Sequence, residues 1–214
     1  MTPEELAALH PRLFHLTTPG AWPTIAARGL LSTAALVALF ELPTERRAAL
    51  TGQRRPAEVP LRHPAHGLAV LNDNLPLSEA ALAGCLDDGL TPADWLGMLN
   101  ARVFFWADEA GLARLVGARM NRGRAREVLV FDTLPLARAH AERLELCPIN
   151  SGATLRRPAR RGLSTFTPLG AMSHAEWRRR RGMSAPDRIL EVAVRDGVPD
   201  IARFLVERRE VRGA

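Results

Sequence analysis

Lysine and tyrosine are absent from this sequence of 214 residues, and cysteine occurs only twice. All 29 basic residues are therefore arginine, and the formal net charge is +6. Complete replacement of lysine by arginine mostly reflects coding composition and is typical of a GC-rich bacterium. Arginine also pairs with phosphate through two hydrogen bonds and stacks on bases, so the charge is compatible with a nucleic-acid partner without identifying one.

Other absences narrow the class of protein. No apolar run approaches the roughly 18 residues that a membrane span needs, and the opening residues lack the basic flank and apolar stretch of a secretory signal. Cys85 and Cys147 lie far apart without CxxC spacing, which predicts two buried thiols rather than a disulfide or a zinc site. We therefore expect a cytoplasmic protein that makes no membrane contact.

Several motifs of known chemistry are also missing. The sequence has no GxGxxG after a strand, no GxxxxGK[ST], no HExxH and no GxSxG, which excludes Rossmann and P-loop chemistry. The six histidines do not cluster at metal-ligand spacing. His63 and His66 lie in a proline-rich segment without a partner cysteine, so we expect no metal site.

The residues that are present predict short strands interleaved with helices. Helix signals occur at 3–10, 21–28, 33–42, from 91, 108–120, 133–143 and from 173, and strand signals occur at 13–17, 102–106, 127–131, 144–149 and 189–194. The strand at 189–194 is the last clear one. Residues 43–66 are rich in Arg, Pro and His, which predicts a basic, solvent-facing and partly mobile excursion. The pattern as a whole indicates one α+β or mixed α/β domain over 1–214.

Three segments carry a more specific pattern. Residues 14–33 read FHLTTPGAWPTIAARGLLST, with a histidine, a threonine two positions later, a short helix and then Gly-Leu. Residues 100–108 (NARVFFWAD) hold a strand with paired aromatics, and residues 189–201 (ILEVAVRDGVPDI) hold a strand with one glutamate. In this order, over about half the chain, the segments resemble the ADP-ribosyltransferase superfamily, and most closely its DarT-type branch, which modifies DNA bases.

The resemblance implies a fold and an activity. The expected core is an ADP-ribosyltransferase-like split β-sheet with flanking helices. NAD would be the substrate, ADP-ribose would pass to a nucleic-acid base (DNA rather than RNA), and nicotinamide would be released. A protein or small-molecule acceptor, or an inactive module that binds NAD or nucleic acid, stays open as an alternative, and so does the choice between a toxin and a repair role.

The resemblance also implies roles for residues in the first and the last of these three segments. Glu191 would bind the 2′-hydroxyl of the nicotinamide ribose and stabilise the developing cation, while His15, Leu16 and Thr17 would bind NAD. His15 and Thr17 are two positions apart, so on a strand they point to one face. The alternatives are a core histidine and a glutamate on an edge strand that faces water, because Glu191 shares its strand face with Arg195.

The aromatic strand and the arginines give further NAD-binding candidates. Phe104, Phe105 or Trp106 would stack on nicotinamide in place of the tyrosine that the superfamily often uses, and alternation places Phe105 on the face opposite the other two. The DarT-type branch uses an arginine before this strand. The sequence does not choose among Arg54, Arg55 and Arg102, of which Arg55 is the catalytic candidate.

Acceptor-binding candidates come from a polar strand end, from a loop before the glutamate strand and from the start of the run WRRRR, where an aromatic ring would stack on a base and guanidinium groups would contact phosphates. They are Asn150, Ser151, Arg161, Thr165, Phe166, Trp177 and Arg178. Turn chemistry and a solvated helix face explain these residues equally well.

Overall fold

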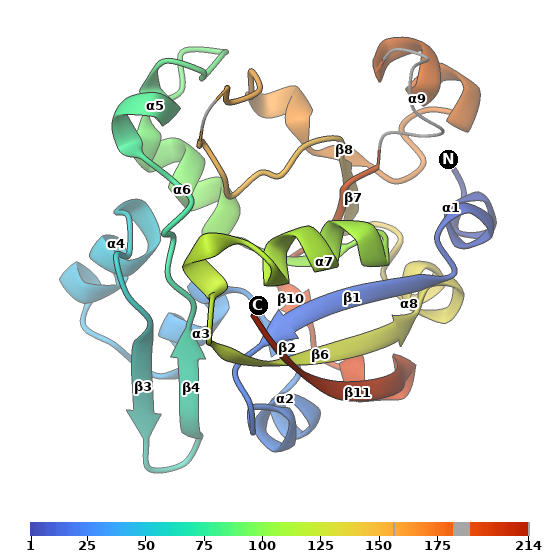
Figure 1. Ribbon diagram of the computed structural model, residues 1–214. Helices are drawn as coiled ribbons and strands as arrows, with labels where there is room; N and C mark the ends of the chain where they lie inside the picture. Colours follow the sequence, from blue (N-terminus) through green and yellow to red (C-terminus); the bar gives the residue numbers. More distant parts are fainter. Residues whose placement is uncertain (156, 182–188, 214) are drawn as a thin grey trace.

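The computed structural model describes residues 1–155, 157–181 and 189–213 (Figure 1). Within these residues the centre of the fold is a seven-stranded antiparallel sheet with the strand order β11-β6-β1-β5-β9-β7-β8. Its strands are β1 (Arg12–Thr17), β5 (Arg102–Trp106), β6 (Ala125–Asp132), β7 (Leu144–Cys147), β8 (Thr167–Pro168), β9 (Glu191–Arg195) and β11 (Leu205–Arg212). A large antiparallel sheet combined with helices agrees with the expected α+β class.

Two small antiparallel pairs stand apart from this sheet. Strand β2 (Leu30–Leu31) pairs with β10 (Gly197–Val198), and β3 (Val59–His63) forms a hairpin with β4 (Gly67–Leu71). Figure 1 shows the β3–β4 hairpin projecting to one side of the main sheet.

Helices flank the strands, and side-chain caps open several of them. They are α1 (Pro3–Leu9), α2 (Trp22–Arg28), α3 (Thr33–Leu39), α4 (Thr44–Gly52), α5 (Glu79–Ala83), α6 (Pro92–Asn100), α7 (Glu109–Val116), α8 (Thr133–His140) and α9 (His174–Arg181), with 3₁₀ turns η1 (Arg119–Asn121), η2 (Leu163–Thr165) and η3 (Ile201–Phe204). Thr2 and Thr91 open α1 and α6 with capping boxes, and Gly29 ends α2 with φ at 91°. Cys85 and Cys147 are buried free thiols, as expected.

Some boundaries and one strand differ from the sequence-based expectation. For the helix predicted over 133–143, the sequence favours Thr133 as the N-cap. In the structure the N-cap of α8 is Asp132, because its carboxylate accepts the Leu134 N–H, and the helix ends at His140. The last strand is β11 and not β9. Its sequence, LVERREVR, is mostly charged because β11 lies at the edge of the sheet, so it lacks the apolar alternation by which strands are recognised.

Residues 43–66, for which the sequence predicts a solvent-facing excursion, contain regular structure. They supply α4 and β3, and Leu61 is buried against Val37, Phe40 and Leu71 in a small core of its own. A few apolar side chains are enough to anchor the segment, although most of its surface faces solvent.

The main sheet is nearly interrupted between β1 and β5. These strands pair at one position only, Phe14 with Trp106, whereas β1 pairs with β6 along its whole length. Beside this position, the side chain of His15 on β1 is hydrogen-bonded to the carbonyl of Phe104 on β5. The sheet therefore consists of two well-paired halves, β11-β6-β1 and β5-β9-β7-β8, joined by a short ladder.

Candidate functional site

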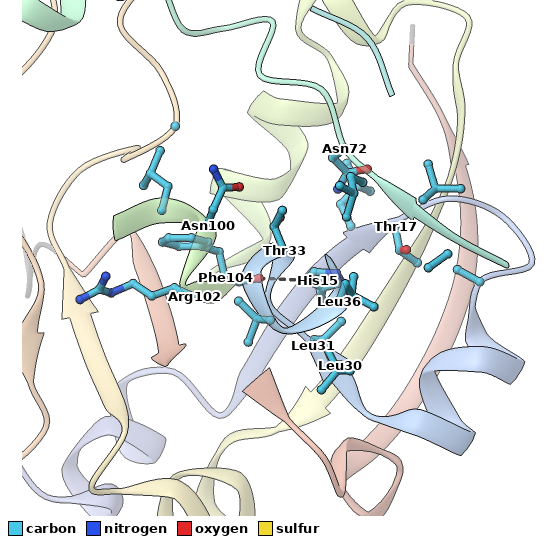
Figure 2. A pocket seen from close by; sticks show the side chains of 18 of the residues that line it. His15, Thr17, Leu30, Leu31, Thr33, Leu36, Asn72, Asn100, Arg102 and Phe104 are labelled. Atoms are coloured by element: carbon cyan, nitrogen blue, oxygen red, sulfur yellow. Dashed lines mark hydrogen bonds between the residues drawn. The ribbon is translucent and has the colours of Figure 1, made fainter. Parts of the chain in front are cut away.

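A cavity of about 370 Å³ lies beside this β1–β5 junction (Figure 2). The residues that line it come mainly from β1, α2, β2, α3, β4, α6, β5, α7, β6 and β9, and from the loops that hold Arg55 and residues 150–152. The volume lies in the range of roughly 300 to 1,000 Å³ that is usual for small-molecule sites.

His15 lines the cavity in a defined protonation state. Its Nδ1 lies 2.9 Å from the carbonyl oxygen of Phe104, and because a carbonyl only accepts, Nδ1 carries the proton. Burial lowers the pKa of His15, against the opposing effect of this hydrogen bond, so the ring is neutral at pH 7. Nε2 is then an acceptor, and it has no hydrogen-bond partner among the described residues.

The neighbours of His15 on β1 share this wall. Thr17 lines the same cavity, as the spacing of two predicts, and Figure 2 shows both side chains at it. Leu16 also contributes to the lining. A core histidine with both ring nitrogens satisfied does not fit this geometry, because Nε2 has no hydrogen-bond partner among the described residues and His15 lines a cavity.

Glu191 lies at the opposite side of the junction. It is the first residue of β9, is 5% exposed, and stands beside Trp106 of β5 and Cys147 of β7. The Ser151 hydroxyl donates to its carboxylate at 2.6 Å, and the Ser151 N–H lies 3.2 and 3.3 Å from its two oxygens. The edge-strand reading is therefore wrong, since β9 is an inner strand and Glu191 faces the cavity.

This environment changes the acidity of Glu191. Burial raises its pKa to about 7, and the hydrogen bonds from Ser151 and the positive charge of Arg161 act in the opposite direction. A carboxyl group with this pKa exchanges a proton readily near neutral pH, which suits general acid–base chemistry.

Among the three candidate arginines, Arg55 is the one that the fold brings to the cavity with unused donors. Its guanidinium donates to the carbonyls of Leu50 and Asn72 and to Oδ1 of Asn100, all of them neutral acceptors. It forms no ion pair among the described residues, because the nearby Asp73 carboxylate is bonded to Arg124 at 2.7 Å. Burial lowers the pKa of Arg55 to about 10, so it stays charged and unneutralised at pH 7.

The other two candidate arginines are engaged elsewhere. Arg54 donates to the carbonyls of Leu77 and Leu75 and is not part of the cavity wall. Arg102 touches the cavity, but its guanidinium lies 2.6 Å from Glu145 and 4.3 Å from the centre of the Phe166 ring. Figure 2 shows the Arg102 side chain extending away from His15.

The aromatic strand divides as alternation predicts. Phe104 and Trp106 line the cavity, whereas Phe105 is fully buried and packs on Phe131 with ring centres 5.7 Å apart. The assignment of Phe105 to NAD binding is therefore wrong, because its ring belongs to the main core.

The acceptor-binding candidates also divide. Asn150 and Ser151 line the cavity, but the remaining candidates do not. Closeness in sequence to the glutamate strand does not bring them to the cavity wall. Those outside the cavity wall are Arg161, Thr165 and Phe166, which are buried, Trp177, which lies in the main core, and Arg178 on α9.

Some polar residues at the cavity are not among the candidates that the sequence patterns indicate. Asn72, Asn100 and Thr33 line it from the end of β4, from α6 and from α3. The run Gly67–Leu71 followed by Asn-Asp-Asn is typical of a strand that ends in a polar turn, and it could have indicated Asn72.

The described residues show neither a metal-binding group nor a membrane-spanning helix. No group of three or more His, Cys, Asp or Glu side chains in the described ranges is placed to hold a metal ion. Among the same residues, no helix is long and apolar enough to cross a membrane.

Comparison with known proteins adds a family but no function. Neither the curated proteins nor the solved structures contain a match to this chain. The model of a family of unknown function, DUF7002, matches residues 11–205, which is most of the chain. The protein therefore belongs to the DUF7002 family.

Proposed function

We propose that this protein is an NAD-dependent ADP-ribosyltransferase that modifies a nucleic-acid base and releases nicotinamide. The observation that carries the proposal is the convergence of His15, Arg55 and Glu191 on one cavity at the junction between two halves of a sheet. The interrupted ladder between β1 and β5 is also what the resemblance to a split-sheet core leads one to expect.

The donors and acceptors of the cavity suit the parts of NAD. Arg55 is a buried cation held only by neutral oxygens, so it favours an anion such as the pyrophosphate. The free Nε2 of His15 and the hydroxyl of Thr17 suit ribose hydroxyls or a carboxamide. Phe104 and Trp106 offer ring faces for a flat heterocycle.

Glu191 supplies the group that the reaction needs. The transfer breaks the bond between nicotinamide and ribose C1′, joins C1′ to a nitrogen of the acceptor base, and releases neutral nicotinamide and one proton. The carboxylate of Glu191 would stabilise positive charge at the sugar, and its pKa of about 7 suits it to take the proton from the acceptor.

The charge of the protein favours a nucleic-acid acceptor. A net charge of +6, made entirely with arginine, favours an anionic partner. DNA is preferred to RNA because of the resemblance to the DarT-type branch, and we place the protein in the cytoplasm on the same grounds as in the sequence analysis.

The test is transfer of label from NAD. NAD labelled in its ADP-ribose part is incubated with the protein and with single-stranded DNA, single-stranded RNA or lysate protein. We expect label on nucleic acid together with an equal amount of nicotinamide, a rate loss of roughly 10²-fold or more in Glu191→Gln, and no loss in the exposed control Glu207→Gln. Label on protein alone would redirect the proposal to a protein acceptor, and no nicotinamide release with any acceptor would refute it.

A further inference from the structure

We infer that Arg161 is a positioning residue for Glu191, holding Ser151 in the place from which it hydrogen-bonds the Glu191 carboxylate. The catalytic consequence of this inference rests on the proposed function, but the placement itself can be measured without any activity.

Arg161 is a buried clamp on backbone carbonyls. Its side chain is among the largest that are almost fully buried, with the residue 2% exposed. Nη1 donates to the carbonyl of Ser151 at 2.9 Å, Nη2 to that of Ala153 at 3.0 Å and Nε to that of Ala159 at 3.1 Å. One planar group thus fixes three points of the chain beside the cavity.

The residue that Arg161 holds is also the one that touches Glu191. The Ser151 carbonyl receives a second hydrogen bond from Trp95 Nε1 at 3.3 Å, and the Arg161 guanidinium lies 5.6 Å from the centre of a Trp95 ring. On its other side Ser151 gives both its N–H and its hydroxyl to the carboxylate. A single residue therefore separates the buried cation from the buried carboxylate.

A charge at this place needs an explanation beyond packing. Burying a guanidinium is costly, and in the described residues Arg161 has no carboxylate within ion-pair distance. Burial lowers the pKa of Arg161, and the thiols of Cys85 and Cys147 and the carboxylate of Glu191 act in the opposite direction. Glu191 is the carboxylate among these groups, and it acts across Ser151. The arrangement resembles an ion pair with Ser151 inserted between its members, which orients the carboxylate and favours its ionised form.

The groups that face Glu191 are few. Cys147 on β7 lowers the pKa of the carboxyl through a side-chain hydrogen bond, as do the Ser151 donors and the charge of Arg161, while Trp106 on β5 carries no titratable group. Burial acts against all of them. Loss of Arg161 would remove a positive charge that lowers the pKa of Glu191. It would also remove the hydrogen bond that holds the Ser151 carbonyl, so the Ser151 N–H and hydroxyl would bind the carboxylate less firmly. Both effects should raise the pKa of Glu191 further.

The experiment compares Arg161→Met with a matched control, Arg160→Met. Arg160 is the neighbouring arginine, but it is exposed, pairs with Asp87 and has no contact with Ser151. The carboxyl carbon of Glu191 is observed by ¹³C NMR in protein labelled at glutamate, with Glu191→Gln to assign its signal, and is titrated from pH 4 to 10.

We expect the midpoint for Glu191 near 7 in the unmodified protein and in Arg160→Met, and at least one pH unit higher in Arg161→Met. The pH profile of nicotinamide release should move by the same amount. An unchanged midpoint in a folded Arg161→Met protein would overturn the inference. If this variant does not fold, Arg161→Lys is used. It keeps the charge, but its single nitrogen cannot replace the three guanidinium nitrogens that reach the three carbonyls, and it too must raise the midpoint.

Failure of the proposed function gives a different result. If the midpoint moves as expected while no variant releases nicotinamide, the positioning role stands and the transferase proposal falls.

Discussion

Burial raises the pKa of Glu191 and its hydrogen bonds lower it, and the effect of burial is the larger. Its pKa is raised from 4.5 to about 7 in the folded protein. Between these values the folded state binds a proton more tightly than the unfolded chain, so stability falls as the pH rises from about 4.5 to about 7 and then levels off. The buried Glu191 carboxylate thus lowers the stability of the fold at neutral pH.

Glu191→Gln should therefore be more stable than the unmodified protein at pH 8, by on the order of 1 to 3 kcal/mol, because the amide carries no charge to bury. The difference should shrink towards pH 4.5. Urea unfolding at several pH values measures it. A difference that stays constant with pH would show that Glu191 does not titrate in this range.

His15 gives a second prediction at the scale of one residue. Its hydrogen bond to the Phe104 carbonyl requires the Nδ1–H form, and burial lowers its pKa below 6.5. We expect ¹⁵N chemical shifts of a neutral ring protonated at Nδ1 at pH 7.5, and still a mostly neutral ring at pH 6.5. Since the unfolded chain takes up the proton first as the pH falls, this residue should also contribute to acid destabilisation. A ring protonated at Nε2 would contradict the geometry.

At the scale of elements, the turn between α2 and β2 shapes one wall of the cavity. Gly29 has φ at 91°, and a Cβ placed there would lie 2.5 Å from Cα of Pro199, which follows β10. Gly20 has a similar φ of 79° but nothing within 4 Å of its Cβ position. The two glycines therefore separate backbone strain from steric clash.

Gly29→Ala should lower the free energy of unfolding by roughly 3 kcal/mol or more, since it adds a backbone clash to the strain of a positive φ. Gly20→Ala should cost only about 1 kcal/mol. Urea unfolding of both variants provides the comparison. Equal losses would mean that α2 and β10 are not packed as closely as the structure has them.

Local sequence patterns predict most of the strands and helices to within a few residues, but they miss two kinds of feature. Strands β1, β5 and β9 follow from short apolar runs, and the capping boxes of α1 and α6 follow from Thr2 and Thr91. The edge strand β11 has no apolar period because one side of it faces solvent. The small core around Leu61 depends on contacts that no local pattern encodes.

Local sequence patterns predict less of the candidate site than of the fold. His15, Thr17 and Glu191 lie on strands that local pattern and resemblance both predict. The choice of Arg55 over Arg54 depends on which of two adjacent side chains turns into a cavity made by distant segments, and only the tertiary structure decides it. The hydrogen bond from Arg161 to the Ser151 carbonyl likewise cannot be predicted from the sequence alone.

At the scale of the whole molecule, ligand binding should stabilise the fold by mass action. NAD at about 100 times its dissociation constant would add roughly 2.7 kcal/mol to the free energy of unfolding. Arg55→Met should lose most of this gain at the same NAD concentration, because an unneutralised cation at the cavity is removed. Arg54→Met should keep it.

The melting temperature of each variant with and without NAD measures the gain. Each variant serves as its own reference, so the loss of the Arg55 hydrogen bonds to the protein cancels. If Arg54→Met and Arg55→Met lose the gain equally, Arg55 has no special role in binding.

The central claim is that His15 and Glu191 face one NAD molecule across the β1–β5 junction. NMR observation of both residues during a single NAD titration, with ¹⁵N in the His15 ring and ¹³C in the Glu191 carboxyl group, tests it most directly. We predict that both signals shift along binding curves with the same dissociation constant, while the ring of the distant His174 stays unchanged. NAD binding that moves neither signal, or only one of them, would contradict the claim.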